Sequence, residues 1–262
     1  MLKLDEIKSF YPKQLHSHGD FLLREYLQIR MLDFISNSPF AASLTFLGGT
    51  ALRIVHGNRR FSEDLDFDNR GVTDSQLREL AQEIQHQFEL EGYELELKQV
   101  TKDAWHAYFR FPGLLFREGL SGHREQKITI RLHTEHQPFD YEPQPFILNR
   151  FEVFSTILTV PLPLLLSQKY SAILSRHRKM GRDFYDVVFL LGKGVQPDFG
   201  YLDQVVGIDC TSGLEAAILR ECRALNMHKL AQDVEPFLFD SKDRQKVISF
   251  VDYFRQSLSL SE

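Results

Sequence analysis

The 262-residue sequence predicts an α+β fold, in which a mixed β-sheet flanked by helices is followed by a helical C-terminal domain. Three observations predict this arrangement. Helical periodicity comes first, strand-like segments are concentrated between residues 44 and 133, and only helical periodicity remains beyond Pro161 and Pro163. We therefore expect two domains, residues 1–160 with an N-terminal helix and the sheet, and residues 161–262 with helices.

The chain opens with a helical pattern and then turns to a strand and a pair of glycines. Apolar residues recur at helical spacing over residues 21–36, which predicts an amphipathic helix. A short apolar strand is expected at residues 44–47, directly before the two glycines. Residues 50–56 then have the pattern of a helix, and Gly57 is placed to close it, because glycine readily adopts the left-handed conformation that follows many helix ends.

The middle of the chain is expected to form the rest of the sheet. Alternation at residues 65–67 predicts a short strand, and residues 73–90 return to helical periodicity. Alternating, β-branched and aromatic residues predict three meandering strands, at residues 95–100, 105–111 and 127–133. Residues 137–144 are rich in proline and turn-forming residues, so we expect a loop that leaves the sheet.

Apolar residues at helical spacing dominate the remainder of the sequence. The predicted helices lie at residues 164–175, 183–191, 213–225, 228–237 and 242–257. No internal repeat accompanies them, so these helices are not expected to form an array. A domain boundary near residue 160 follows from this change of pattern.

Composition excludes several classes of protein. A hydrophobic fraction of 43% and a charged fraction of 26% are typical of a soluble globular protein, and no apolar run is long enough to span a bilayer. The first six residues mix charges with apolar side chains, so we expect no export signal, no membrane partner and a cytoplasmic location. Cys210 and Cys222 are too few for a disulfide framework or a zinc cluster and are predicted to be free buried thiols.

Bulk electrostatics do not favour nucleic-acid binding. The net charge is −5, whereas counterion release requires a basic surface. Two local basic patches are candidates, although a charge run is more often only a solvated face. The first comprises Arg53, Arg59 and Arg60, and the second comprises Arg176, His177, Arg178, Lys179 and Arg182.

The glycine pair is the first candidate binding site. Gly48 and Gly49 let the backbone approach a ligand closely, and the N-terminus of the following helix offers unpaired N–H groups to a phosphate. Thr50 adds a hydroxyl group at the same place. Such a turn is weak evidence alone, since most glycine turns only connect elements.

Two aspartates one helix later strengthen this interpretation. Asp64 and Asp66 alternate along a strand, so their carboxylates project to one face while Leu65 and Phe67 point into the core. Two like charges held close together repel each other, and a divalent cation relieves the repulsion. Magnesium suits the pair because it is commonly held by one or two carboxylates plus substrate phosphates. An exposed acidic edge is the alternative interpretation.

The glycine turn, a gap of about ten residues and an Asp-x-Asp pair together resemble the nucleotidyltransferase superfamily. The segment resembles the AbiEii-type toxin nucleotidyltransferases more closely, which characteristically have GGTAL followed by an R-F-S-x-D-L-D-F block. Here that block is Arg60-Phe61-Ser62-Glu63-Asp64-Leu65-Asp66-Phe67. The match is therefore specific to a family within the superfamily.

A second matching block lies in the helical half, in QKYSAILSRHRKMGRDFYDVVFLL. The family's helical lysine, which is thought to contact the triphosphate in a K-x-x-A context, corresponds to Lys169 with Ala172. Its R-D-x-x-D block corresponds to Arg182 and Asp183 with Asp186, which shares a helical face with Asp183. Without the resemblance, Lys169 is a surface lysine and Arg182 and Asp183 form an ion pair at a helix start, while Asp186 braces Arg182 or Arg176.

One position departs from the superfamily pattern. Many members have a third carboxylate on a later strand, and by spacing Arg131 occupies that position here. Arginine cannot bind a metal and cannot act as a base at ordinary pH. Glu135 or His133 could supply the missing group, Asp183 from the second domain could take the role, or Arg131 could instead neutralise substrate phosphate.

The resemblance implies a nucleotidyltransferase of the EC 2.7.7 type that acts as the toxin of a type IV toxin-antitoxin system. Its substrate would be a nucleoside triphosphate, its cofactor Mg²⁺ or Mn²⁺, its acceptor an RNA such as the 3′ end of a transfer RNA, and a further partner a cognate antitoxin. The helical domain would complete the active site. The implied catalytic residues are Asp64, Asp66, Lys169 and Asp183, with Asp64 and Asp66 as metal ligands. The implied nucleotide-binding residues are Gly48, Gly49, Thr50, Ser62, Lys169 and Arg182.

Alternatives remain open at this point. A protein hydroxyl or a small molecule such as an antibiotic would keep the same chemistry with a different acceptor. A non-catalytic nucleotide- or partner-binding module on the same scaffold is the rival from another class, and Arg131 is its best support. The preferred nucleotide and the oligomeric state do not follow from the sequence.

Overall fold

The computed structural model describes residues 2–101 and 104–259, which fall into two compact units. The sheet unit comprises residues up to 56, 61–138 and 143–159. The helical unit comprises residues 57–60, 139–142 and those from 160 onward. The chain therefore passes between the units more than once.

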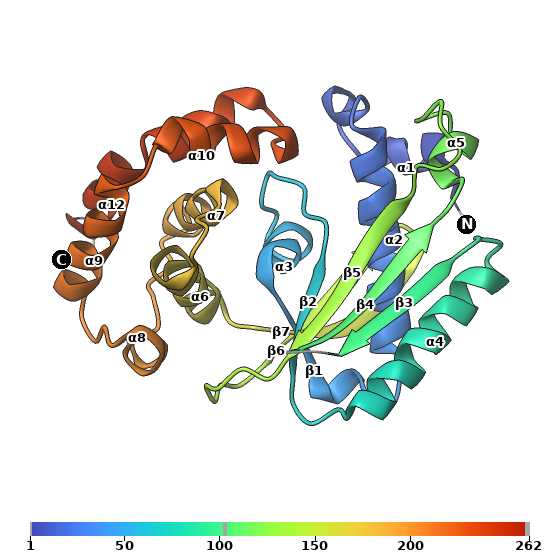
Figure 1. Cartoon of the computed structure of the whole chain (residues 1–262), viewed down its shortest axis with the longest axis horizontal. Helices are drawn as coiled ribbons and strands as arrows, with labels where there is room; N and C mark the ends of the chain where they lie inside the picture. The colour runs from blue at the N-terminus through green and yellow to red at the C-terminus, as the bar shows by residue number, and fades with distance from the viewer. Residues whose placement is uncertain (1, 102–103, 260–262) are drawn as a thin grey trace. The chain divides into compact units, whose positions relative to one another are not determined.

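A seven-stranded mixed sheet forms the framework of the sheet unit, with the strand order β3-β4-β5-β2-β1-β7-β6 (Figure 1). The pairs β1 with β7 and β2 with β5 are parallel, and the other neighbouring pairs are antiparallel. The strands are β1 (Leu44–Leu47), β2 (Leu65–Asn69), β3 (Glu96–Thr101), β4 (Trp105–Phe111), β5 (Ile128–Glu135), β6 (Gln144–Arg150) and β7 (Val153–Thr159). This mixed sheet, accompanied by helices, confirms the predicted fold class.

Several α-helices accompany the sheet in this unit, and α2 and α4 pack together along one face of the sheet (Figure 1). They are α1 (Leu4–Ser9), α2 (Gly19–Ser36), α3 (Gly48–Ile54), α4 (Asp74–Leu90) and α5 (Leu114–Arg117). Thr73 caps α4 and forms a reciprocal capping box with Gln76, which satisfies backbone donors of the first turn. Alternate side chains of β4 and β5 are fully buried, for example Ala107, Phe109, Ile130 and Leu132. The opposite face of these strands is consequently free to be polar.

The predicted loop at residues 137–144 is confirmed up to residue 143, but the hairpin of β6 and β7 that follows it was not predicted. Residues 144–150 pair with residues 153–159 in full antiparallel register. Pro145 made this segment difficult to recognise, because proline cannot donate to a strand ladder. It is tolerated here because β6 is an edge strand and pairs only with β7.

The helical unit contains α6 (Leu162–Ser175), α7 (Gly181–Leu191), α8 (Phe199–Val206), α9 (Thr211–Arg223), α10 (Met227–Val234), α11 (Gln245–Ile248) and α12 (Phe250–Ser259). Helix α8 was not predicted. The single helix expected at residues 242–257 is instead divided into a 3-10 turn (Ser241–Arg244), α11 and α12, with a break at Ser249. Cys222 is buried as expected, but Cys210 is exposed, which corrects the prediction for that thiol.

None of the helices formed by residues 2–101 and 104–259 combines the length and hydrophobicity needed to cross a bilayer.

Candidate active site

Gly48 lies directly against Asp66. Leu47 is the register partner of Asp66 in the antiparallel pair of β1 and β2, so the residue after Leu47 turns over the Asp66 side chain. Gly48 has a φ of +81°, and a Cβ atom placed on it would lie 2.7 Å from the Asp66 Oδ2 atom. Glycine is required at position 48 for two reasons. It readily adopts the positive φ angle, and its missing side chain leaves space beside the Asp66 carboxylate.

The two aspartates share the polar face of the sheet. Leu65 and Phe67 are 0% and 3% exposed, while the side chains of Asp64 and Asp66 are 27% and 26% exposed. This is the alternation that the sequence predicts for a half-buried strand. Both carboxylates are therefore open to solvent and directed to one side of the sheet.

The parallel strand β5 places two basic groups beside the aspartates. The Arg131 Nη2 atom donates to the Asp64 Oδ2 atom over 2.7 Å. His133 is the register partner of Asp66, and its Nδ1 atom lies 3.3 Å from the Asp66 Oδ1 atom. Glu135 instead pairs in register with Asp68, and its side chain is 60% exposed. Of the two β5 groups considered for the missing carboxylate, His133 is thus the one next to Asp66.

A second histidine extends this polar face. His106 on β4 is the register partner of His133, and the two rings stack with centroids 4.7 Å apart. Burial, together with the neighbouring His133 and Arg131 charges, lowers the pKa of His106 from its ordinary value. His106 therefore favours its neutral form. No sequence pattern distinguished it from an ordinary strand residue.

The Thr50 side chain contacts the backbone just before β2. The residue is fully buried, and its hydroxyl donates to the backbone carbonyl of Asp64. The hydroxyl group thereby supports the strand entry that carries Asp64. Gly48 and Gly49 lie at the end of β1 where α3 begins, and nucleotide binding by Thr50 stays a prediction.

Two of the three arginines of the first candidate basic patch, Arg53 and Arg60, are buried, whereas Arg59 is exposed. The Arg53 guanidinium is buried and donates to Glu25, with Nε 2.7 Å from Oε2. Arg60 is only 1% exposed and belongs to an ion-pair cluster in the helical unit. Two arginines that are close in sequence can thus be withdrawn from the surface by separate buried carboxylates.

Asp186 is the centre of that buried cluster. Its Oδ1 atom accepts from the Arg60 Nε and its Oδ2 atom from the Arg60 Nη2, both over 2.7 Å. Asn58 Nδ2 also donates to Oδ1 over 2.8 Å, and Lys169 Nζ lies 2.7 Å from Oδ2. Asp186 therefore braces Arg60, not Arg182 or Arg176 as considered from the sequence. Burial alone would raise its pKa, but Arg60 and Lys169 outweigh this and hold the pKa of Asp186 at about 2.

Lys169 is held between two carboxylates. Besides Asp186, its Nζ atom donates to the Asp183 Oδ1 atom over 2.9 Å, and Arg176 donates to the other Asp183 oxygen over 2.7 Å. The Lys169 side chain is 12% exposed and that of Asp183 is 2% exposed. An ammonium group has three donors. Two of the three Lys169 donors point to carboxylates, which fixes the orientation of its ammonium group. One donor is left for a further oxygen.

The second candidate patch contains cations that are paired with carboxylates. Arg178 is 81% exposed and lies 3.8 Å from Asp233, whereas Lys179 is 13% exposed and lies 3.3 Å from Glu221. Arg176 is half-exposed and pairs with Asp183, and Arg182 is half-buried. Acidic partners thus offset much of this run of charges.

Asp64 and Asp66 fit a magnesium ion. Both offer hard carboxylate oxygens at a half-exposed position, and the absent Cβ of Gly48 leaves space beside the Asp66 Oδ2 atom. Within the described parts of the chain there is no group of three or more His, Cys, Asp or Glu side chains arranged to hold a metal. A site with two protein carboxylates still suits magnesium, because substrate phosphates and water complete its coordination.

Sequence reasoning named the aspartates and Lys169 but missed what surrounds them. Asn58, Arg60 and His106 were not proposed as partners. Arg60 did carry a signal, since it opens the R-F-S-x-D-L-D-F block. The sequence could not reveal that its partner is Asp186, because the two residues are 126 positions apart.

Two solved structures from Helicobacter pylori are similar to this fold. JHP933 aligns with a TM-score of 0.56 and 15% identity over 91% of this chain and 92% of its own. A protein described as a candidate nucleotidyltransferase aligns with a TM-score of 0.55 and 17% identity over 92% of this chain and 97% of its own. At these identities the likeness concerns the fold. No curated protein sequence matches the chain significantly.

The sequence match to a family is more specific than these structural likenesses. The family described as "Nucleotidyl transferase AbiEii toxin, Type IV TA system" matches residues 30–244. The matched region includes the glycine turn, both aspartates and the Lys169 cluster, and it extends over most of the chain. The protein therefore belongs to the AbiEii family of nucleotidyltransferase toxins of type IV toxin-antitoxin systems.

Proposed function

We propose that this protein transfers a nucleoside monophosphate from a nucleoside triphosphate to an RNA hydroxyl, with Asp64 and Asp66 as the metal-binding catalytic residues. The observation that carries the proposal is the contact of Gly48 with Asp66. A backbone turn with no side chain lies beside one of two carboxylates that face the same side of the sheet. Phosphoryl transfer requires this combination of space for a polyphosphate and oxygen ligands for its metal.

Asp64 and Asp66 would hold Mg²⁺ or Mn²⁺. When bound, the ion supplies charge neutralisation for phosphate oxygens. Chelation of divalent cations is therefore expected to abolish transfer, and added Mg²⁺ or Mn²⁺ to restore it.

The residues of this chain would then position the reactants. In the transfer, the acceptor oxygen forms a bond to the α-phosphorus, the bond between the α-phosphorus and the bridging oxygen breaks, and pyrophosphate leaves. The hydroxyl proton passes to a base, for which an Asp64 or Asp66 oxygen is proposed. Gly48 and Gly49 accommodate the phosphates, with Ser62 and Arg182 as further nucleotide contacts. Lys169, oriented by Asp183 and Asp186, offers its third donor to a phosphate oxygen.

The proposed acceptor is RNA, and the 3′ end of a transfer RNA is the leading candidate. It is supported by the toxin family and by the exposed cations at Arg176 and Arg178. A cognate antitoxin is proposed as the cellular partner that limits the effect of the toxin. A cytoplasmic location is proposed because nucleoside triphosphates and RNA are present there.

The test is transfer of label from each α-labelled nucleoside triphosphate in the presence of Mg²⁺ and total RNA. We expect label in RNA, and a loss of about a thousandfold in the Asp66→Asn variant, since metal charge stabilisation is worth several kcal/mol. Asp203→Asn, at an exposed position of α8, is the control and should retain full transfer. Circular dichroism should show the same folded spectrum for all three proteins. Undiminished transfer by Asp66→Asn would refute the assignment, and label in protein would redirect the acceptor.

The pair of Arg131 with Asp64 favours one second candidate, a nucleotide-binding module without turnover. Arg131 occupies a carboxylate oxygen that the metal would otherwise use. Binding of a triphosphate without incorporation of label into RNA or protein would select this candidate. Incorporation that depends on Asp66 excludes it.

A further inference from the structure

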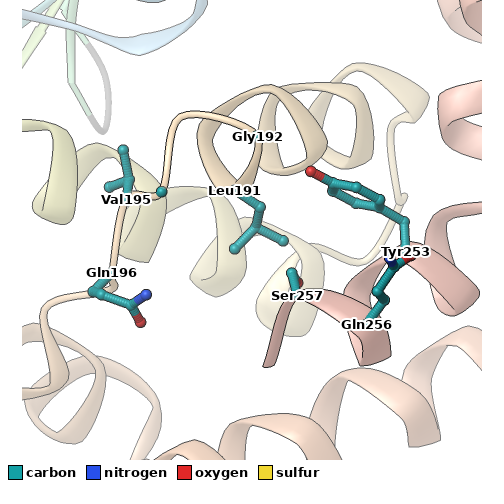
Figure 2. A pocket seen from close by; sticks show the side chains of 8 residues that line it. Leu191, Gly192, Val195, Gln196, Tyr253, Gln256 and Ser257 are labelled. Carbon is teal, nitrogen blue, oxygen red and sulfur yellow. The ribbon is translucent and has the colours of Figure 1, made fainter. Parts of the chain in front are cut away.

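Two cavities adjoin each other in the helical unit and share no residue with the Asp64 and Asp66 site. The first, of about 500 Å³, lies between the end of α7, the loop after it and α12 (Figure 2). The second, of about 610 Å³, lies between α7, α11 and α12. Gly192 and Tyr253 line both cavities, so the two form one continuous surface.

The first cavity combines apolar walls with neutral polar groups. Its side chains are Leu191, Val195, Gln196, Tyr253, Gln256 and Ser257. In Figure 2 the Gln196 amide extends from the loop toward Leu191, and Tyr253, Gln256 and Ser257 project from α12. None of the described residues that line it is charged. A cavity lined by apolar and uncharged polar side chains suits a neutral group of mixed polarity, such as a nucleobase.

The second cavity is basic. Lys193, Lys242 and Lys246 line it, against a single carboxylate, Asp243, among the described lining residues. Lys246 is held by that carboxylate, with its Nζ 3.0 Å from the Asp243 Oδ1. Lys193 and Lys242 are exposed and contribute the surplus positive charge, although the whole protein carries −5. Such a local reversal of sign attracts an anion.

Aromatic rings accompany the lysines. Lys193 Nζ lies 5.2 Å from the centroid of the Phe189 ring, and Phe189 lines the basic cavity. The Tyr253 side chain stands where the basic cavity meets the neutral one, with its hydroxyl within 3.4 Å of a Cβ placed on Gly192. Tyr253 therefore lies in contact with the end of α7. A positive groove with aromatic faces is the combination that binds single-stranded nucleic acid.

We propose that this surface binds a single-stranded segment of RNA, with a base in the neutral cavity, its phosphates along Lys193 and Lys242, and Tyr253 stacked on a base between them. It serves as a docking site for RNA apart from the residues that carry the chemistry. That the bound RNA is also the acceptor of the nucleotide depends on the proposed function. Binding itself requires no turnover.

The experiment measures the affinity of the full chain for a labelled single-stranded RNA of about ten nucleotides by fluorescence anisotropy, without nucleoside triphosphate. Replacing Lys193 and Lys242 together by alanine should weaken binding at least fivefold. The slope of log affinity against log salt should become shallower by about 1.4, because each phosphate contact on a single strand contributes about 0.7. The double variant Lys13→Ala with Lys229→Ala removes the same charge from exposed positions elsewhere and should bind as the wild type does.

A second pair of variants separates stacking from charge. Tyr253→Ala should weaken binding about fivefold or more, whereas Tyr253→Phe should retain the affinity, since the ring supplies the stacking. Thermal unfolding identifies any variant that fails to fold. If Tyr253→Ala does not fold, the variants of the exposed lysines still test whether this surface binds RNA. Equal weakening by the pocket and control lysine pairs would overturn the proposal, as would unchanged affinity in the pocket pair. If the wild-type protein binds RNA at this surface but transfers no nucleotide to it, the result would contradict the proposed function and leave the docking site supported.

Discussion

Two clusters of charged residues from the same family blocks differ in how they are built. On the sheet, Asp64 and Asp66 are each about a quarter exposed and face basic groups from one neighbouring strand. In the helical unit, Asp183 and Asp186 are at most 2% exposed and are surrounded by Arg60, Lys169 and Arg176. The first cluster keeps carboxylate oxygens available to solvent. The second uses its carboxylates to hold cations, so the same residue type is solvent-accessible in one cluster and engaged in buried ion pairs in the other.

The largest effect is expected from Asp186→Ala. Removal of this carboxylate leaves the Arg60 guanidinium and the Lys169 ammonium buried with one partner fewer, which should lower the free energy of unfolding by about 3–5 kcal/mol. Urea unfolding measures the change. Asp203→Ala, at an exposed site of α8, should change the stability by less than about 0.5 kcal/mol. A loss below about 1 kcal/mol in Asp186→Ala would show that the buried cluster is not the structural centre.

The Gly48→Ala variant tests the contact between Gly48 and Asp66, and Gly57→Ala is its matched control. A Cβ on residue 48 meets the Asp66 carboxylate at 2.7 Å, so we expect transfer to fall about a hundredfold through displacement of that group. Gly57→Ala shares the strained backbone, with a φ of +77°, but its Cβ meets nothing within 4 Å. Both variants should lose about 1 kcal/mol of stability. Similar transfer rates in the two would argue that contact with Asp66 does not matter.

The pH dependence of stability follows from the lowered pKa of Asp186. A carboxylate whose folded-state pKa lies below its unfolded value stabilises the fold above the unfolded pKa. That contribution disappears as the pH falls from about 4 toward about 2. The shift corresponds to about 2 kcal/mol. The stability difference between wild type and Asp186→Asn, measured by urea unfolding at several pH values, should therefore shrink across this window. A difference independent of pH would contradict the assignment.

Arg131→Gln should have the smallest effect of the four. This half-exposed guanidinium competes with a cation for the Asp64 Oδ2 atom, and such pairs contribute about 1 kcal/mol or less. We expect the Mg²⁺ concentration that gives half-maximal transfer to fall up to about fivefold. Arg110→Gln, on the same face of the adjacent strand, removes an equal charge and should leave it unchanged. A higher Mg²⁺ requirement in Arg131→Gln would mean that Arg131 orients Asp64 for the metal.

Local patterns predicted the parts of the fold whose cause is local. Alternation at Leu65, Asp66 and Phe67 was sufficient to place two carboxylates on one face, because strand side chains alternate whatever the neighbours are. The strand with Pro145 was missed, since its tolerance depends on lying at the edge of the sheet. Edge position is a property of the assembled sheet and is not written in the segment itself.

The candidate site was predictable in its residue types and less so in their partners. The family blocks identified Asp64, Asp66, Lys169 and Asp183, whose roles stay a prediction. The direction of the Thr50 hydroxyl and the burial of Arg53 depend on contacts between segments distant in the chain. A charge run in a sequence carries no information about which of its members meets an opposite charge in the core.

The ion pair of Arg60 with Asp186 limits how such toxins can exchange their two halves during evolution. Arg60 belongs to a four-residue segment, 57–60, that joins the helical unit, while the chain on either side belongs to the sheet unit. A recombination event near residue 160 would bring a new helical half to a chain that still carries this arginine. Unless the incoming half supplied a carboxylate at the position of Asp186, a desolvated cation would be left unmatched. Inheritance of the two halves is thus expected to be linked, with exchange confined to parents that share this arginine-aspartate pair.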